Sequence, residues 1–525
     1  MTTRSRFLSI ILIAALLLVP LSALGDDPAH GDDEQSYSVS ERELLEAASS
    51  ITEQVAEIRG LPMQSPIPKG VKDRDQLREM LVERFHDEIS EEEFEAEAQV
   101  YRRLGLIDED LDYREMMLDL LSEQIAGFYD QEAGELYIMA GLPTQLQRPT
   151  MAHELFHAIQ DQHFDIEYLL EPFASQDRSD YSLARMALIE GDATVLMFDY
   201  TFYEQGLLPQ NRARSFVDIP RMAAFVLELD PMDMAPAEQL GDSDALDLGD
   251  DAPSLSDSRL ADAPPIIRDP LLFPYHEGMQ FVVRARSGRT WDEFNEIYDQ
   301  APVSTSQILD PELYFDGIEP IDVQFDATDG LPDDYRLAYD NVFGELMIRS
   351  WLRTHLEESQ PQLAEEAASG WRGDRIRGYE SPDGDMLVTH LSTWDSVDDA
   401  EEFARALEEI AALRYDTPPS HSLGTHGESW CIRPGSDDRG ERLYIERWGP
   451  MVLYIEGTPS LLGDDGAETD PTTYLVRDTV WDSHLRLPFE EIFHEAMEDV
   501  ENRAETDAEA LAPGIGSAVP FATFR

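Results

Sequence analysis

Two histidines and the glutamate between them have the residue types and the spacing needed to hold a metal ion. They lie in the segment His153-Glu154-Leu155-Phe156-His157, which matches the pattern H-E-x-x-H. Residues four apart on a helix share one face, so both imidazoles can reach a single tetrahedral ion. The carboxylate then lies beside the water that such an ion carries. The segment predicts a hydrolytic zinc centre, with His153 and His157 as ligands and Glu154 as general base.

The residues around this motif predict a helix preceded by two short strands. Apolar side chains at helical spacing run from Thr150 to Gln162, with Thr150 as the candidate N-cap. Upstream, residues 125–130 and 136–139 flank a polar turn that contains Gly134, as in a hairpin. The alternative is that both histidines merely cap or support a core helix, because short motifs also arise by accident.

A third metal ligand is expected from elsewhere in the chain, and two residues are candidates. On an uninterrupted helix His163 would lie about 240° round and roughly 9 Å along from His157, away from the metal face. Glu190 lies on a second predicted helix, from about Asp180 to Glu204. A carboxylate from a separate helix completes a His2Glu set and leaves the fourth position to water. We therefore expect Glu190 to be the ligand.

These motifs resemble those of the gluzincin branch of zinc metallopeptidases, in which H-E-x-x-H is followed by a glutamate on a later helix. Residues 152–162 and 190–193 resemble more narrowly a group of exported, acidic, thermolysin-clan-like proteins of halophilic prokaryotes. The resemblance covers roughly residues 55–320. It implies a mostly helical zincin-like domain with a small strand hairpin, and a peptidase that cleaves an extended peptide or protein substrate. Thr194 stands where thermolysin-like sites often have an acidic residue, which is a departure.

Four more residues are candidates for roles around the ligands. Asp161 and Asp192 could each accept a ring N–H from a ligand histidine. The resemblance implies that a later tyrosine or histidine stabilises the developing oxyanion, and Tyr275 and His276 are the candidates. Structural roles remain the alternatives, since aspartates in an acidic chain are often solvated and aromatic residues beside proline often pack in a core.

A peptide substrate is expected to lie extended along an edge strand beside the metal. Residues 136–139 are the candidate for that strand. The alternative is an interior strand with Tyr137 in the core, because so short an alternation does not distinguish the two.

The charge of the chain excludes nucleic acid as an expected partner. The formal net charge is -69, from 108 acidic and 39 basic side chains, and this surplus repels phosphate backbones and anionic membranes. It also opposes compaction unless salt screens it, as at molar salt, where the Debye length is about 3 Å. We therefore expect adaptation to saline surroundings. The single cysteine, Cys431, cannot form an intramolecular disulfide.

Residues 1–25 predict a secretory signal peptide. Two arginines precede an apolar run from Phe7 to Leu21, and residues 22–25 provide small side chains for cleavage. The run is shorter than the roughly 20 residues of a spanning helix, although a retained anchor is the alternative. We therefore expect export to the periplasm, the cell surface or the medium, with no integral membrane span after signal removal.

The rest of the chain divides into two expected modules of an α+β protein. A polar leader (26–38) precedes the metallopeptidase domain (39–325), which contains an acidic insert at 233–264. Its helical patterns at 40–59 and 73–121 either pack under the metal helices or form a removable pro-segment. An antiparallel α+β accessory domain follows (330–500), then a tail (501–525). It is expected to begin with a helix at 335–358 and to position substrate or bind an unknown partner.

Two other functions remain open. The first is a non-catalytic surface or binding protein on the same scaffold, although Glu154 would then have no chemical purpose. The second is a zinc amide or ester hydrolase that acts on cell-envelope material. The sequence does not distinguish an envelope substrate from a peptide.

Overall fold

The computed structural model describes twelve stretches of the chain, and all structural statements below refer to them. They are 41–88, 90–124, 127–130, 134–139, 144–170, 179–208, 215–228, 259–357, 359–423, 427–432, 442–458 and 476–481. The predicted signal peptide, the leader, most of the acidic insert and the tail lie outside these residues.

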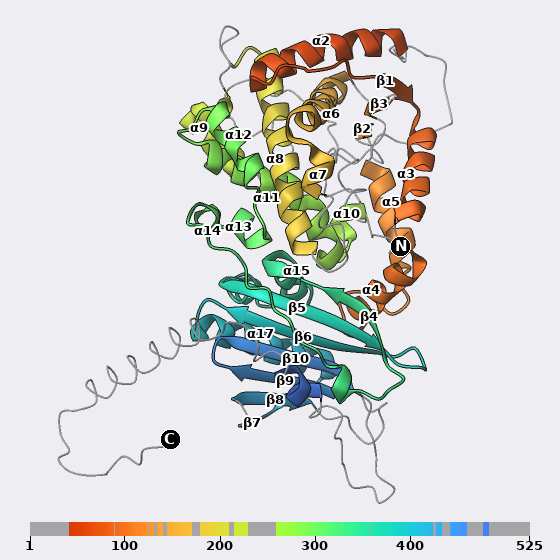
Figure 1. Ribbon diagram of the computed structural model, residues 1–525, viewed down its shortest axis with the longest axis vertical. Coiled ribbons are helices and arrows are strands. Elements are labelled where there is room, and N and C mark those ends of the chain that lie inside the picture. Colours follow the sequence, from red (N-terminus) through yellow and green to blue (C-terminus); the bar gives the residue numbers. More distant parts are fainter. Residues whose placement is uncertain are drawn as a thin grey trace, which may run out of the picture.

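The first module consists mainly of helices (Figure 1). They are α2 (Glu41–Arg59), α3 (Arg74–Glu88), α4 (Glu91–Arg103), α5 (Tyr113–Gln124), α6 (Thr144–Phe164), α7 (Ile166–Leu170), α8 (Ser179–Glu204), α9 (Pro220–Leu227), α10 (Arg259–Asp262), α11 (Pro265–Arg286), α12 (Trp291–Asp299), α13 (Thr305–Leu309) and α14 (Pro311–Phe315). The predicted metal helices are α6 and α8. α8 runs lengthwise from the seven-stranded sheet toward the end of the molecule that carries α2 (Figure 1).

A three-stranded sheet lies beside the metal helices. Its strands are β1 (Lys69–Lys72), β2 (Gly127–Asp130) and β3 (Glu135–Met139), in the order β1-β3-β2. β2 and β3 are antiparallel, as the predicted hairpin requires, whereas β1 pairs parallel to β3. Of the two alternatives for residues 136–139, the edge strand is wrong and the interior strand is confirmed, since β3 is central and β2 is at the edge. Tyr137 itself is only half-buried. The sequence did not indicate β1, because Lys-Gly-Val-Lys has no strand-like alternation.

The second module is a seven-stranded antiparallel sheet with helices, so the expected α+β class is confirmed (Figure 1). The strand order is β4-β5-β6-β10-β9-β8-β7. The elements are β4 (Arg336–Asn341), α15 (Gly344–Leu356), α16 (Pro361–Glu366), β5 (Trp371–Glu380), β6 (Met386–Trp394), α17 (Val397–Tyr415), β7 (Ser420–Leu423), β8 (Glu428–Ile432), β9 (Arg442–Trp448) and β10 (Met451–Thr458).

Two predicted helix boundaries are wrong. The helix expected at 335–358 begins instead as strand β4, and α15 starts only at Gly344, whose φ of 72° favours glycine. The metal helix α6 starts at Thr144 rather than after Thr150, so Thr150 is not its N-cap. Pro149 lies inside α6. A proline there removes one backbone hydrogen bond, which made it a plausible helix boundary in the sequence.

One hydrophobic core joins the two modules. A single cluster of buried side chains extends from Leu77 in α3 to Tyr454 in β10. α15 contributes to this connection, because it packs against α8 and α11 of the first module and against β5 and α17 of the second. A second cluster lies among α2, α6, α8 and the small sheet, and includes Ile51, Phe156 and Leu196.

Polar contacts fix the start of α8 against the second module. Ser179 and Asn341 exchange two hydrogen bonds, from the Ser179 backbone N–H to Asn341 Oδ1 (3.0 Å) and from Asn341 Nδ2 to Ser179 Oγ (2.7 Å). Asp180 Oδ1 accepts from the backbone N–H (3.0 Å) and the hydroxyl of Thr305. Thr305 Oγ1 in turn accepts from the backbone N–H of Leu346 in α15 (3.2 Å). The helix that carries Glu190 is therefore tied to both modules.

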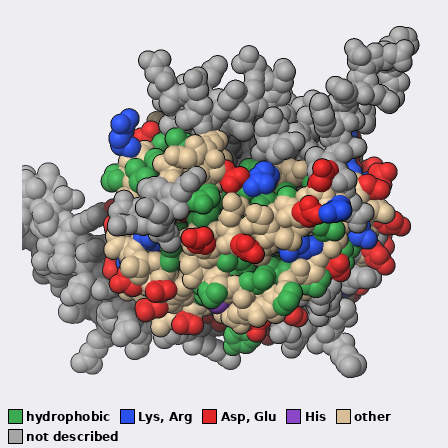
Figure 2. Space-filling view, turned by 90° about the horizontal axis from the view of Figure 1, so that it is seen from above, with side chains coloured by type: hydrophobic (Ala, Val, Ile, Leu, Met, Phe, Trp, Pro, Cys, Tyr) green, Lys and Arg blue, Asp and Glu red, His purple; other side chains and the backbone are tan. Residues whose placement is uncertain are grey.

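On one face of the molecule, acidic side chains are spread out rather than collected at one site. Figure 2 looks onto the molecule from the end that carries α2 and shows Asp and Glu side chains dispersed over the described part of this face, with fewer Lys and Arg. Among the described residues, no helix combines the length and apolar character needed to cross a membrane.

Candidate metal centre

Helices α6 and α8 bring the three predicted ligands together. His153 Nε2 lies 3.0 Å from Glu190 Oε2 and 3.0 Å from His157 Nε2. His157 Nε2 lies 3.3 Å from Glu190 Oε2. The three donor atoms thus form a nearly equilateral triangle, and of the described residues these form the one group of three or more that could hold a metal ion.

The size of this triangle fits a zinc ion. Ligand atoms bound at about 2.0–2.2 Å to a tetrahedral zinc ion lie about 3.3 Å or slightly more from one another. The observed separations of 3.0–3.3 Å are close to that value. All three residues are at most 3 % exposed, and Glu190 Oε1 has no hydrogen-bond partner. A buried carboxylate oxygen without a partner is costly, so the donor set and its burial favour a cation here.

Electrostatics within the triangle follow from burial and from the glutamate. Burial alone would lower the pKa of His157, but the Glu190 carboxylate raises that pKa to about 9. For His153 burial prevails and lowers the pKa. Burial would raise the pKa of Glu190, but the His157 ring, followed by His153, lowers it. Glu190 is therefore held as a carboxylate, the form that binds a metal ion.

Glu154 lies beside the triangle and is positioned by the edge strand β2. Its Oε2 accepts a hydrogen bond from the backbone N–H of Tyr129 (3.1 Å), whereas Oε1 has no hydrogen-bond partner. Burial raises the pKa of Glu154 to about 8. A carboxyl group whose pKa is near neutrality can both accept and return a proton, which general acid–base chemistry requires.

Two glycines allow α8 and α11 to touch. A Cβ on Gly191 would lie 2.2 Å from the backbone carbonyl carbon of Gly278, and a Cβ on Gly278 would lie 2.2 Å from the carbonyl oxygen of Ala187. This contact brings Tyr275 of α11 to the metal helix, where its ring centroid lies 6.2 Å from that of His153. The predicted tyrosine is therefore next to a ligand.

The ring of His276, the other oxyanion candidate, lies near two residues of its own helix. Its Nε2 lies 3.1 Å from Gln280 Nε2, and its Nδ1 lies 3.3 Å from Glu277 Oε1. Both neighbours belong to its own helix. Of the two oxyanion candidates, Tyr275 has a ring next to a ligand, and its role stays a prediction.

The two predicted aspartates do not contact the ligand rings directly. Asp161 accepts from the Tyr129 hydroxyl (2.9 Å) and from the backbone N–H of Ile166 (3.2 Å). Asp192 is paired with Arg59 and with a tyrosine of α12. His163 Nε2 lies 2.8 Å from the carbonyl oxygen of Pro62, which agrees with its exclusion as a ligand.

The acceptor on the His157 ring is a residue that the sequence reasoning missed. Gln160 Oε1 lies 2.8 Å from His157 Nδ1. Gln160 is three residues after His157, and residues three apart share a helix face. That spacing was a usable signal, but only carboxylates were considered as ring acceptors.

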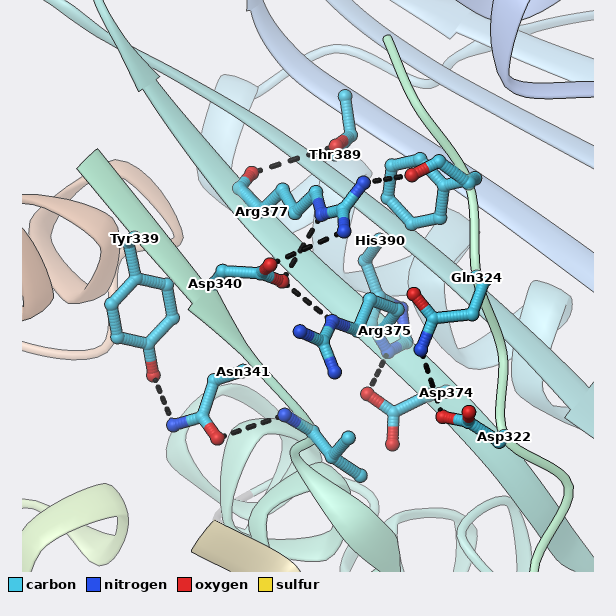
Figure 3. Close-up of polar contacts among 12 residues, drawn as sticks. Asp322, Gln324, Tyr339, Asp340, Asn341, Asp374, Arg375, Arg377, Thr389 and His390 are labelled. Carbon is cyan, nitrogen blue, oxygen red and sulfur yellow. Dashed lines mark hydrogen bonds and ion pairs between the residues drawn. The ribbon is translucent and has the colours of Figure 1, made fainter. Parts of the chain in front are cut away.

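The second module has its own cluster of buried and half-buried polar side chains (Figure 3). Arg375 and Arg377 of β5 both donate to Asp340 of β4, at 2.5 and 3.0 Å. His390 of β6 lies 3.1 Å from Asp374 of β5. These contacts tie adjacent strands together. That the module positions substrate or binds a partner stays a prediction.

Comparison with known proteins gives one match, in the second module. Residues 335–465 match the model of a family described as a domain of unknown function (DUF8575). The match covers β4 to β10, and it begins well after the residues of the candidate metal centre, which it does not include. No curated protein and no solved structure matches the chain.

Proposed function

We propose that this protein is a zinc-dependent peptidase of gluzincin type, with His153, His157 and Glu190 as metal ligands and Glu154 as general base. The observation that carries the proposal is the triangle of donor atoms, with sides of 3.0–3.3 Å, beside a buried glutamate whose second oxygen lacks a partner. A scaffold without turnover has no need for that glutamate.

The residues of the chain divide the chemistry among them. Zinc, when bound, supplies Lewis acidity and lowers the pKa of a bound water toward 7. Glu154 takes the proton from the attacking water and returns it to the leaving amine. The Tyr129 N–H holds one oxygen of Glu154, so the other remains available for the proton. Tyr275, next to His153, is the candidate donor to the oxyanion.

The arrangement of the small sheet supports an extended substrate. β2 is the edge strand next to Glu154, and its Tyr129 N–H is directed at that carboxylate. A peptide that adds to this edge as a further strand passes Glu154. We propose β2, rather than β3, as the strand that guides a peptide or protein substrate. We further propose that the protein is exported, on the basis of residues 1–25, which lie outside the described residues.

Metal analysis combined with a protein-cleavage assay tests this function. Wild type, Glu154→Gln, Glu190→Ala and the control His163→Ala are purified at molar salt. Bound zinc is measured, together with the new amino termini released from an unfolded protein. We expect one zinc per chain in wild type, Glu154→Gln and His163→Ala, and loss of zinc in Glu190→Ala. Glu154→Gln is expected to lose on the order of 100-fold or more in cleavage rate.

Two results would overturn the proposal. If the purified wild-type protein contains no zinc, the proposed metal centre is refuted. If one zinc ion is bound per chain but cleavage does not depend on Glu154, the proposed peptidase mechanism is refuted. In the second case, a screen of envelope amides and esters distinguishes a different hydrolase from a binding protein.

A further inference from the structure

A buried chain of side chains connects α2 to the ligand His157. Gln160 Oε1 lies 2.8 Å from His157 Nδ1, and Gln160 Nε2 donates to the Tyr298 hydroxyl (2.9 Å). Tyr298 donates to Asp192 Oδ2 (2.8 Å), and Asp192 pairs with Arg59, whose Nε and Nη2 both donate at 3.0 Å. All five side chains are buried. The residues of this hydrogen-bonded series belong to four separate helices.

The orientation of the Gln160 amide is fixed by its neighbours. Besides Tyr298, Gln160 Nε2 donates to the backbone carbonyl oxygen of Ile189 (3.0 Å). A carbonyl oxygen can only accept a hydrogen bond, so the NH2 group must face Ile189 and the amide oxygen must face His157. His157 Nδ1 therefore has to carry the proton that this oxygen accepts. When the ring is neutral, its Nε2 is then left with a free lone pair, the form that binds a metal ion.

The Arg59–Asp192 pair, at the end of the hydrogen-bonded series farthest from His157, fixes the direction of the Tyr298 hydroxyl. The Arg59–Asp192 pair is fully buried, and the Arg59 guanidinium lies 3.9 Å from the centroid of the Trp291 ring. Asp192 accepts from Arg59, so its remaining capacity attracts the Tyr298 proton. Tyr298 cannot then donate to Gln160 and must accept from it. Burial, followed by the charge of Asp192, raises the pKa of Tyr298 well above its usual value, which keeps that proton in place.

We propose that Gln160 is a positioning residue that sets the tautomer and the direction of His157, and that Tyr298, Asp192 and Arg59 hold its amide in the required orientation. This rests on the proposed metal centre. An amide here does the work that a carboxylate commonly does for metal-bound histidines, without adding another negative charge to the site. It also makes α2 part of the metal site, which argues against removal of residues 41–59 as a pro-segment.

The test measures zinc affinity and the His157 tautomer rather than turnover. Zinc binding is measured by competition with a chelator for wild type, Gln160→Leu, Tyr298→Phe and the control Gln162→Leu. Gln162 lies on the same helix but accepts from the backbone N–H groups of Gln64 and Ser65. The tautomer is read from nitrogen-15 shifts of labelled histidines in the metal-free protein, at a pH above the pKa of about 9 to which His157 is raised, so that its ring is neutral.

We expect Gln160→Leu to weaken zinc binding on the order of 10- to 100-fold, as for other groups that orient metal-bound histidines. In the metal-free protein it should shift one histidine from the Nδ1–H toward the Nε2–H form. Tyr298→Phe should produce a smaller shift of the same sign, and it replaces Gln160→Leu as the test if that variant does not fold. Gln162→Leu should leave zinc affinity and tautomer unchanged.

The outcomes separate this inference from the proposed function. Failure of wild type to bind zinc overturns both. If wild type binds zinc and the folded Gln160 and Tyr298 variants bind it equally well, with unchanged histidine shifts, the metal centre stands and the positioning role is refuted. A loss of affinity in Gln162→Leu equal to that in Gln160→Leu also refutes it, because the effect would then belong to the helix as a whole.

Discussion

The contact between α8 and α11 leads to a prediction for Gly191→Ala. The added Cβ would lie 2.2 Å from the carbonyl carbon and 2.3 Å from the carbonyl oxygen of Gly278, whereas ordinary contact begins at 3.4 Å. The helices must therefore separate by about 1.2 Å, the difference between 3.4 and 2.2 Å, since backbone atoms cannot rotate away. Gly191 is adjacent to Glu190, so the shift displaces the third ligand relative to α6 and Tyr275 relative to His153.

We expect this variant to lose about 1–3 kcal/mol of stability from overpacking. Cleavage of an unfolded protein should fall by on the order of 100-fold, the typical result of a 1 Å displacement in an active site. Zinc affinity should fall as well. The assays are thermal unfolding, chelator competition and release of amino termini.

The matched control is Gly206→Ala, at a glycine with nothing within 4 Å of the added Cβ and a φ of +73°. It should cost about 1–2 kcal/mol from the backbone alone and leave zinc binding unchanged. If folded Gly191→Ala keeps wild-type zinc affinity and activity, the idea that the Gly191–Gly278 contact sets the site geometry is wrong.

Three further predictions concern stability. Burial raises the pKa of Asp180 from 3.8 to about 8, so between these values the folded protein keeps a proton that the unfolded chain releases, and stability falls as pH rises by up to about 1.4 kcal/mol per pH unit. Denaturant unfolding at pH 5 and pH 7.5 should show a smaller loss of stability between the two pH values for Asp180→Asn than for wild type. An equal loss in both proteins contradicts the raised pKa of Asp180. Arg59→Met should lower the free energy of unfolding by about 3–5 kcal/mol, because it leaves the Asp192 carboxylate buried without its cation. In the same assay the double variant Arg59→Met with Asp192→Asn should lose less stability than Arg59→Met alone, and an equal or larger loss argues against the ion pair. Because the net charge is -69, the temperature of the unfolding midpoint should rise when sodium chloride is increased from about 0.1 M to about 1 M, as the Debye length shortens from about 10 to about 3 Å. A midpoint that does not depend on salt contradicts the predicted saline adaptation.

The parts of the site that the sequence could predict depend on local spacing. His153 and His157 share a helix face whatever the rest of the fold does, and Glu154 is fixed between them. Glu190 followed from the number of ligands that a zinc site needs, and the structure places it with both histidines. In each case the helical period or the ligand count carried the information.

The parts that failed depend on contacts between distant segments. The Gln160 chain joins residues separated by more than 100 positions, as from Asp192 to Tyr298, and no periodicity encodes such a contact. The position of β3 inside its sheet depends on pairing with β1, more than 60 residues earlier in the chain, as the register of Lys69 with Leu136 shows. The sequence predicted one helix through β4 and α15. The start of α15 at Gly344 depends on close packing against Asp180, a distant residue that local spacing does not reveal.

The attachment of α8 to both modules has a practical consequence for working with this protein. A fragment that stops near residue 325 would keep all the proposed zinc ligands, yet it would leave Ser179 without Asn341 and expose the surface that α15 covers. The same cut would open the continuous apolar interior. Expression of the first module alone should therefore give insoluble or metal-poor material, and the shortest useful unit retains the strands through Thr458.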